Sequence, residues 1–384
     1  MIDFNFGIFI LWFMCFILLS IIYLIDRCKY STLSMMVEYF VCSFIFTVKG
    51  GFFSGLTFAD PDGHLIISSS LFDGDFLKWL SLFKADAFFY NWLVSPLVFY
   101  FNSINAVIVI NMLLVSLSMY VFNKVYKIVW CEHSFFNNIL LILFPSLIFF
   151  TLDPTVREIA LIFFILLGFF NVLLFERDRE IKNFIFFVFF ISLSAFLHTA
   201  FALIFFGYFV YRLLSKPSFT NYFFVFILAF MLFYLFSQGL FSDKFNLLEK
   251  AGDVNTLQSW GAIGRASYPN YLMVNSNIEG FFLFPIRLVA YFSLPFFWMI
   301  HSVQDFLGFI DGLFYIFIIS RLIKYRELIK HNKFAVLLVF LFIFSLFAFS
   351  YITSNYGALI RHRIKFYFFI LLLFPPKIQV RFFK

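Results

Sequence analysis

The chain has very little charge. Only 13% of its 384 residues are Asp, Glu, Lys or Arg, whereas 63% are hydrophobic. A soluble chain of this length cannot place so many continuous apolar stretches in one core. These stretches do not alternate with polar residues as β-barrel strands do, and helices satisfy their own backbone hydrogen bonds in lipid. The sequence therefore predicts an all-α, polytopic integral membrane protein.

Several chemical signatures are missing. The four cysteines form no CxxC pair and have no metal-ligand spacing, so we expect no disulfide and no metal. There is no P-loop, HExxH or nucleophile-elbow motif, which disfavours ATP-driven transport, metalloproteolysis and serine hydrolysis. We expect no cofactor. The net charge of +7 is spread over linkers without a Lys/Arg run, so nucleic acid is not an expected partner. No internal repeat is visible, which disfavours a transporter built from duplicated halves.

Apolar stretches of 16 to 22 residues recur along the chain. Placing the basic linkers in the cytoplasm predicts about eleven transmembrane helices, with a range of eleven to thirteen. Two proline-containing segments, 88–103 and 281–299, are expected to be half-membrane or interfacial. We expect one transmembrane domain, 1–384, with outer-face loops at about 57–104 and 239–300. The predicted spans are 4–25, 36–56, 105–123, 135–151, 159–175, 183–198, 199–214, 219–238, 303–323, 334–352 and 364–380.

Three groups of ionisable residues stand at the ends of apolar stretches, and the predicted topology places all of them on one side of the membrane. They are Arg157-Glu158, His198 and Arg361-His362-Arg363. Ionisable groups at membrane depth are costly and usually face a partner, a cavity or water. An arginine held by Glu158 suits a clamp on phosphate, although the same residues also suit a helix start with a local ion pair.

His198 suits acid–base chemistry or phosphate contact, or a single interfacial hydrogen bond. The Arg361–Arg363 group suggests an anion site, because an orientation signal would place its charges in the cytoplasm.

The two outer loops add further candidates. Asp60 and Asp62 lie in an Asp-Pro-Asp-Gly sequence, which suits a solvated turn but also a base that removes a proton from a sugar hydroxyl. We place them ahead of Asp73, Asp75 and Asp86 for this role. The second loop carries Arg265 after two glycines, in either a flap or an ordinary loop, and Arg287 beside Pro285.

The stretches Arg157-Glu-Ile-Ala160 and Ser194-Ala-Phe-Leu-His198-Thr-Ala200 resemble the Arg-x-x-x-Ala and Ala-x-x-x-His-x-Ser/Thr-Ala signatures of EpsG-like and Wzy-type polysaccharide polymerases. The alanine after Arg157 stands at the third position here. Gly357-x-x-x-Arg361-His-Arg363 is similar to the entry to a late helix in that family, and 285–298 is similar to its Pro-x-x-Trp segment. Relatives often have a proline shortly after the second arginine, and this chain does not.

The resemblance implies a GT-C-like membrane enzyme of the glycosyltransferase type. Such an enzyme polymerises undecaprenyl-diphosphate-linked oligosaccharide repeats of O-antigen, capsule or exopolysaccharide at the periplasmic face of the bacterial inner membrane. Its partners would be these lipid-linked oligosaccharides, membrane lipids and a chain-length regulator protein. The resemblance and the charge pattern together suggest Asp60, Asp62 and His198 as catalytic residues, with Glu158 and His362 in supporting roles. The expected diphosphate ligands are Arg157, Arg265, Arg287, Arg361 and Arg363.

Two alternatives stay open at this point. A GT-C glycosyltransferase that uses a polyprenyl-phosphate sugar would extend its product by one sugar at a time. A flippase or exporter of lipid-linked glycan would carry charges through the centres of several spans, whereas here the charges gather at one face.

Overall fold

The computed structural model describes residues 6–26, 28–52, 71–82, 89–153, 157–215, 218, 220, 268–269, 272–273, 277–353 and 355–376. Regular structure over these residues is entirely helical. The predicted all-α class is confirmed for this part of the chain.

Five of the described helices are long and apolar enough to cross a membrane. They are α1 (Phe6–Ile25), α6 (Asn105–Trp130), α9 (Glu158–Asp178), α16 (Val303–Lys324) and α18 (Lys333–Ile352). Their lengths fit a hydrocarbon layer, which needs about 20 helical residues. These helices indicate a membrane protein.

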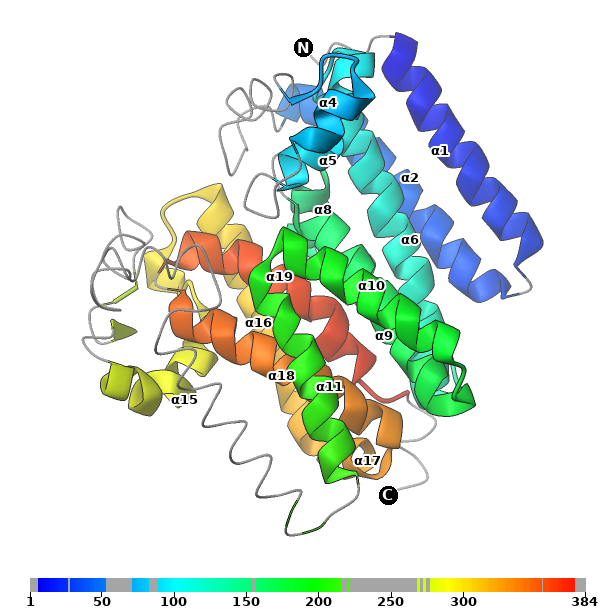
Figure 1. Ribbon diagram of the computed structural model, residues 1–384. Helices are drawn as coiled ribbons and strands as arrows, with labels where there is room; N and C mark the ends of the chain where they lie inside the picture. The colour runs from blue at the N-terminus through cyan, green and yellow to red at the C-terminus, as the bar shows by residue number, and fades with distance from the viewer. Residues whose placement is uncertain are drawn as a thin grey trace. The chain divides into compact units, whose positions relative to one another are not determined.

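The chain divides into two compact units, 1–197 and 198–384. In the first unit, α2 (Lys29–Phe52) packs against α6, and α6 also packs against α9 (Figure 1). The helix α10 (Ile181–Leu197) runs back along α9, while α1 lies against α2 and α6. Short linkers between these helices favour neighbours that run in opposite directions.

Buried amides fix one end of this unit. Asn123 of α6 and Asn138 of α7 (Phe135–Ile142) exchange amide hydrogen bonds of 3.0 Å, and Asn123 Nδ2 also donates to Ser34 Oγ at 2.9 Å. Tyr30 Oη accepts from Asn138 Nδ2 at 2.9 Å. Because buried amides are costly unless they are paired, these bonds specify how α2, α6 and α7 meet.

A pair of indoles joins α4 (Phe76–Ser81) to α5 (Phe89–Phe101). The rings of Trp79 and Trp92 stack with centroids 4.1 Å apart and 1° between their planes. Trp79 Nε1 donates to the Trp92 carbonyl at 2.9 Å, and Trp92 Nε1 donates to the Trp79 carbonyl at 2.8 Å. Stacking and satisfied N–H groups together hold this corner.

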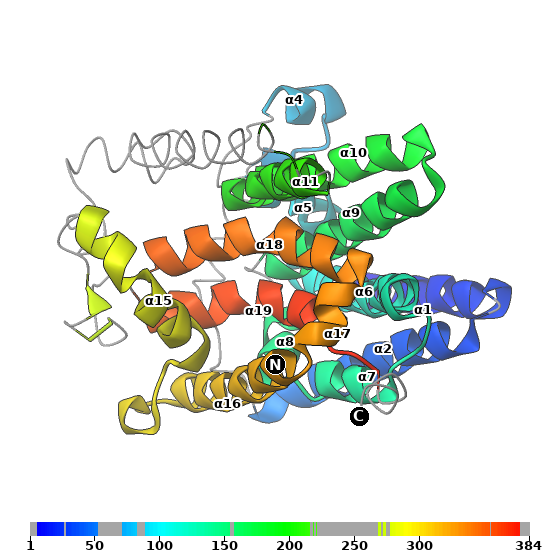
Figure 2. The same ribbon diagram turned by 90° about the horizontal axis from the view of Figure 1, so that it is seen from below.

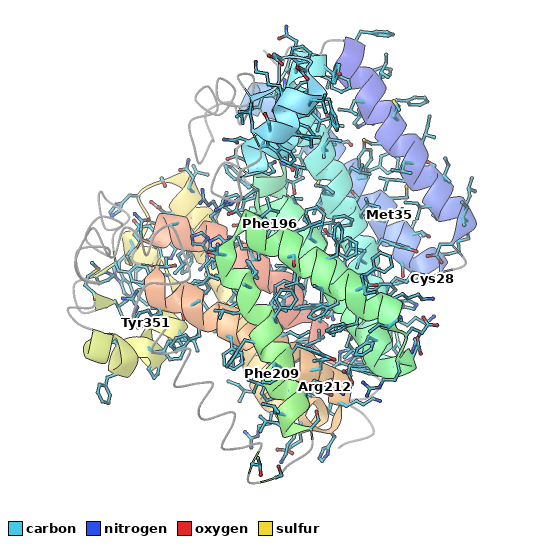
Figure 3. The ribbon with its side chains drawn as sticks, in the orientation of Figure 1. Cys28, Met35, Phe196, Phe209, Arg212 and Tyr351 are labelled. Atoms are coloured by element: carbon cyan, nitrogen blue, oxygen red, sulfur yellow. The ribbon has the colours of Figure 1, made fainter. Side chains whose placement is uncertain are left out.

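The second unit is built around two neighbouring helices, α18 and α19 (Tyr356–Leu372), which lie alongside each other (Figure 2). The helix α11 (Leu203–Leu214) packs on α18, and Figure 3 shows Phe209 and Arg212 near its far end. Along 359–376 every residue is buried except Arg361, which is half-buried. The other α-helices described in this unit are α15 (Asn277–Ser293), α16 and α17 (Arg326–His331).

A glycine sets the spacing between α11 and α18. A Cβ at Gly207 would collide with the backbone carbonyl of Phe340 and would stand 3.2 Å from the Cα of Leu341. Such close approach of backbones is typical of small residues in membrane helix pairs.

Several predicted span boundaries agree with the structure. The chain breaks at His198 between α10 and the 3₁₀ turn Thr199–Ala202, as predicted. The stretch 88–103 corresponds to the 13-residue α5 with Pro96 inside it, and 281–299 contains the end of α15 with Pro285. The predicted span 219–238 lies outside the described residues, apart from Thr220.

Two predicted boundaries are wrong. The stretch 135–151 is not one helix, because Pro145 begins a new helix, α8 (Pro145–Thr151), after α7 ends at Ile142. Proline lacks a backbone N–H and is favoured in the first turn of a helix. The last predicted span, 364–380, corresponds to α19, which begins at Tyr356. Asn355 caps this earlier start by accepting from the N–H groups of Gly357 and Ala358.

Candidate functional site

His198 opens the second unit at the break before the 3₁₀ turn Thr199–Ala202. Its backbone is extended, with φ −158° and ψ 108°. The turn is tied to α18 because Ser345 Oγ donates to the Ala200 carbonyl at 3.1 Å. The His198 ring lies 4.5 Å from the ring of Phe349, measured between centroids. The hydrogen bond from Ser345 therefore fixes the turn that follows His198, and the His198 ring lies against the Phe349 ring.

His362 of α19 meets His198 at this surface. The two imidazole rings are perpendicular, with centroids 5.6 Å apart, and His362 also lies 5.1 Å from the Phe349 ring. Lys365 Nζ is 3.0 Å from His362 Nδ1 and 4.8 Å from the centroid of Phe349. We refer to His198, Phe349, His362 and Lys365 as the His198–Lys365 cluster.

The side chains of the cluster differ in their exposure. His198 and Arg361 are half-buried, whereas His362 is 7% exposed and Lys365 is fully buried. Arg361 and Lys365 are four residues apart on α19 and therefore share a helix face. Three basic side chains, those of His198, His362 and Lys365, thus come together around the Phe349 ring. Such a set suits an anion, since buried charge needs compensation.

Arg287 has a different environment. Its guanidinium donates to the carbonyls of Leu272 at 2.5 Å, Tyr351 at 3.0 Å and Thr353 at 2.5 Å, with a longer contact of 3.4 Å to Ser350. The last carbonyls of a helix have no intrahelical partner. Arg287 supplies donors to those at the end of α18, so these contacts give it a structural role.

Arg363 is likewise fully buried among backbone carbonyls. It donates to Leu294 at 2.5 Å, to Phe292 at 3.4 Å and to Gly308. Its guanidinium lies over the Tyr315 ring at 5.5 Å, and Asp311 acts on it electrostatically. Arg363 therefore joins the end of α15 to α16. That Arg287 and Arg363 also bind a diphosphate stays a prediction.

Arg157 and Glu158 belong to the first unit. Arg157 is half-buried at the N-cap position of α9 without a side-chain capping bond, and Glu158 is 1% exposed in the first turn. Helix N-termini favour such a carboxylate. Asp153 is also 1% exposed, and its carbonyl accepts from Asn111 Nδ2 at 3.4 Å. Asp153 and Glu158 are thus two buried acids close to Arg157 in the sequence.

The other predicted site residues Asp60, Asp62 and Arg265 lie outside the described residues. Asp73 is described. It is exposed, and its Oδ2 forms an ion pair with Lys78 Nζ at 2.5 Å. The hydrogen bond from Lys78 lowers the pKa of the Asp73 carboxyl group. Within the described ranges, no three His, Cys, Asp or Glu side chains form a group that could hold a metal ion.

Comparison with protein-family models, curated proteins and solved structures finds no match for this chain. Functional assignment therefore depends on the residues and their geometry.

Sequence reasoning missed Lys365 and Asp153. Lys365 follows Arg361 by four residues and His362 by three, so its presence on the same helix face was visible in the spacing. The predicted span 364–380 contains Lys365 as its second residue, and no role was predicted for it. Asp153 precedes Pro154 in the sequence, a pattern that suits a solvated helix start, so its burial could not be foreseen.

Proposed function

We propose that this protein is a membrane-embedded glycosyltransferase that polymerises polyprenyl-diphosphate-linked oligosaccharides. The observation that carries the proposal is the meeting of His198 and His362 beside Lys365. His198 and His362 come from two sequence motifs that resemble those of polysaccharide polymerases. Their convergence supports a common site for an anionic group.

The proposed reaction needs a stabilised diphosphate leaving group. Lys365, His362 and Arg361 would bind its oxygens, because preorganised cationic donors stabilise charge that develops in a transition state. Arginine contributes planar paired donors, while lysine contributes a compact charge.

Transfer also needs a group that takes the proton of the acceptor hydroxyl. His198 is half-buried in the same cluster and can act as this base near neutral pH. Asp60 and Asp62 stay predictions for the same role. Arg287 and Arg363 would act by holding helix ends in place, as their carbonyl contacts indicate.

The proposal includes a GT-C-like fold with about eleven spans. It also includes the bacterial inner membrane as location and a site that faces the periplasm. The growing glycan and the incoming repeat would both be carried on undecaprenyl diphosphate. The five long apolar helices support a membrane location, and the predicted topology supports the outward-facing side.

The test is complementation of a gene deletion, with surface glycan separated on a gel. The deletion strain should show a core bearing one repeat, and Arg361→Ala should give the same single band because a diphosphate ligand is lost. The matched control is Arg326→Ala on α17, whose side chain is 75% exposed, and it should restore the full ladder.

Other outcomes point elsewhere. A full ladder from Arg361→Ala would contradict its assignment as a diphosphate ligand. Loss of even the single repeat in the deletion strain would indicate flipping or assembly of the lipid-linked glycan, and growth by single sugars would indicate a polyprenyl-phosphate-dependent transferase.

A further inference from the structure

A second chemically distinctive site lies in the first unit, where the linker between α1 and α2 meets the residues that follow α6. Cys28 stands at this linker (Figure 3) and directly precedes the first residue of the 24-residue helix α2. Its thiol is half-buried. A thiol at a helix N-terminus is stabilised as the thiolate by the helix dipole. This position alone makes no site, so the neighbouring side chains decide its chemistry.

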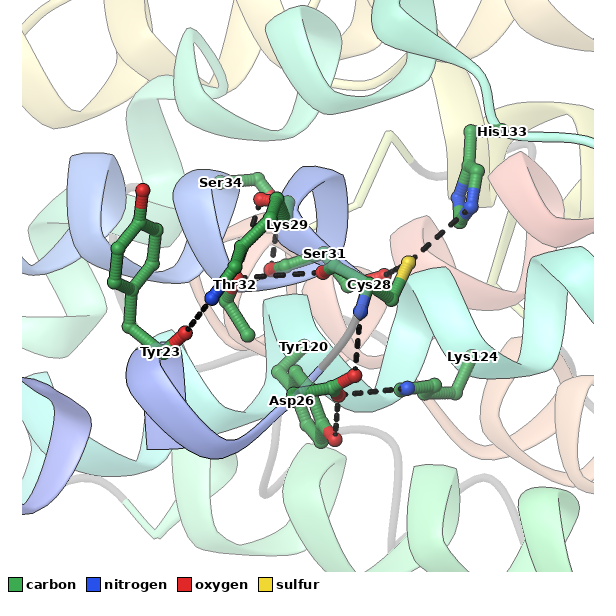
Figure 4. A network of polar contacts seen from close by, with 10 residues as sticks. All are labelled: Tyr23, Asp26, Cys28, Lys29, Ser31, Thr32, Ser34, Tyr120, Lys124 and His133. Carbon is green, nitrogen blue, oxygen red and sulfur yellow. Dashed lines mark hydrogen bonds and ion pairs between the residues drawn. The ribbon is translucent and has the colours of Figure 1, made fainter. Parts of the chain in front are cut away.

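Two polar side chains contact the sulfur atom (Figure 4). His133 Nε2 lies 3.3 Å from Cys28 Sγ, and Ser31 Oγ lies 3.2 Å from it. The His133 ring is held by Tyr30, with ring centroids 4.9 Å apart. A nucleophile beside a base that is itself oriented by a third group is the usual arrangement for an activated thiol.

The surrounding charges favour an anion at this sulfur. Partial burial raises the pKa of the Cys28 thiol, but hydrogen bonds with Ser31 and the charges of Lys124 and Lys127 lower it further, so the net shift is downward. Burial and the same two lysines lower the pKa of His133, which leaves its ring neutral near pH 7 and able to accept a proton. The charged and titratable groups that act on the thiol or contact its partners include Asp26, Tyr30, Tyr120, Lys124, Lys127 and His133.

The linker is anchored so that the thiol keeps this position. Asp26 Oδ1 accepts from the Cys28 backbone N–H at 2.7 Å, and Asp26 Oδ2 pairs with Lys124 Nζ at 2.7 Å. Tyr120 also donates to Asp26 (Figure 4). One carboxylate thus binds the linker to α6 and places Cys28 opposite His133.

We propose that Cys28 is a modifiable nucleophilic thiol with His133 as its proton acceptor, and that it takes anionic low-molecular-weight disulfides of the glutathione class. His133 accepts the Cys28 proton, and the sulfur attacks one sulfur of the disulfide. A new sulfur–sulfur bond forms at Cys28 while the old one breaks. The departing thiolate takes the proton from His133 and leaves as a free thiol.

This site is independent of the proposed glycan chemistry. The basic linkers place it on the cytoplasmic side, where thiols are normally reduced and mixed disulfides are transient. An adduct cannot keep the contacts of the sulfur with His133 and Ser31. Modification would therefore loosen the linker that joins α1 to α2.

The test uses the full-length protein in membrane vesicles. Iodoacetamide labelling is measured at each cysteine by peptide mass spectrometry between pH 5 and 10. Cys131 is an exposed thiol two residues from His133 and serves as an internal reference. We expect the Cys28 rate to rise at a lower pH than the Cys131 rate. Coinciding pH profiles would overturn the proposal.

Substitution separates a proton acceptor from a structural neighbour. His133→Gln should slow Cys28 labelling at pH 7 by about fivefold or more and shift its pH profile upward, with Cys131 unchanged, because the acceptor is lost. The matched control His331→Gln, in the exposed end of α17, should change neither. If His133→Gln fails to fold, Ser31→Ala must shift the Cys28 profile upward. An unchanged Cys28 profile in the folded variants would refute the assignment.

The second measurement uses oxidised glutathione as the probe. A glutathionyl adduct should form at Cys28 in the wild-type protein and disappear in Cys28→Ser. Adducts confined to Cys131, or no adduct at all, would exclude Cys28 as the modified thiol.

Discussion

At the scale of single residues, two basic nitrogens in contact restrict each other. His362 Nδ1 and Lys365 Nζ are 3.0 Å apart. In a hydrogen bond between them, one nitrogen donates its proton and the other must be unprotonated to accept it. Imidazole accepts at a ring nitrogen only when that nitrogen is unprotonated. A bound anion would remove the restriction, because both groups could then donate to it.

This restriction predicts proton uptake on anion binding. Pyrophosphate binding to the detergent-solubilised protein should take up about one proton near pH 7, since the His362–Lys365 contact is exchanged for contacts with oxygen atoms. Calorimetry in two buffers with different ionisation enthalpies measures it. His362→Gln should abolish the uptake, and equal heats in both buffers for the wild type would argue against the cluster as an anion site.

A second residue-scale prediction concerns Asp26. Partial burial raises its pKa, but its bonds with Lys124, Tyr120 and the Cys28 N–H outweigh this and lower it to about 2. An unfolded Asp has a pKa of about 3.9. The stabilisation by ionised Asp26 is therefore complete above about pH 4 and is lost as the pH falls through about 2.

Asp26→Asn should accordingly lower the melting temperature at pH 7, and the difference from wild type should shrink between pH 4 and pH 2. Asp178→Asn is the control, since Asp178 pairs with Arg177 on the exposed surface and such pairs contribute little. Equal effects of the two substitutions at pH 7 would show that the Asp26 contacts do not stabilise the fold.

The candidate site shows what could be foreseen for individual residues. His198 and His362 were identified because charge is rare in this chain, so each basic residue near an apolar stretch is informative. The environments of Arg287 and Arg363 could not be foreseen. In the sequence, an arginine that donates to backbone carbonyls looks the same as an arginine that binds an anion. The carbonyls that Arg287 and Arg363 contact are 15 to 71 residues away along the chain.

At the scale of helices, prolines show the limit of prediction. Pro96 and Pro285 lie inside helices, whereas Pro145 separates α7 from α8. Helices of membrane proteins tolerate proline where neighbouring groups satisfy the freed carbonyl. That outcome depends on tertiary packing, so hydropathy alone joined α7 and α8 into one span. The long helix α18 was placed within one residue because its apolar stretch is almost uninterrupted, and α16 was placed equally well although it contains Asp305 and Asp311.

The close approach of α11 to α18 at Gly207 can be tested by substitution. Gly207→Ala should destabilise the protein by about 1–3 kcal/mol, because the added methyl group meets the α18 backbone and the two helices must separate. Gly168→Ala is the matched control, since its Cβ would meet the Ile191 side chain, which can move. Thermal unfolding in detergent compares them. A smaller loss for Gly207→Ala than for Gly168→Ala would contradict the close backbone approach.

At the scale of the whole molecule, the sequence predicted the helical class and the membrane location from composition. It did not predict the division into two compact units at His198. A division depends on which helices pack together, and the apolar stretches here are too alike to specify partners. Hydropathy measures burial from water, while the choice of partner depends on side-chain shape.

The predicted membrane topology can be tested by cysteine labelling from each side of the membrane. Single cysteines introduced at positions 157 and 361 of a variant lacking the native cysteines should react with an impermeant maleimide from the periplasmic side. Cysteines at 124 and 177 should react from the cytoplasmic side, because the basic linkers are retained there. Labelling of 157 and 361 from opposite faces would exclude a common outward-facing site.

The stacked indoles of Trp79 and Trp92 have a further consequence for experiments on the intact protein. Two stacked chromophores at 4.1 Å share their excited states, so their ultraviolet absorption and emission should be shifted from those of isolated tryptophans. This shift reports on the contact between α4 and α5, within the segment predicted to face outward. Events at that corner can therefore be followed spectroscopically without attaching a dye.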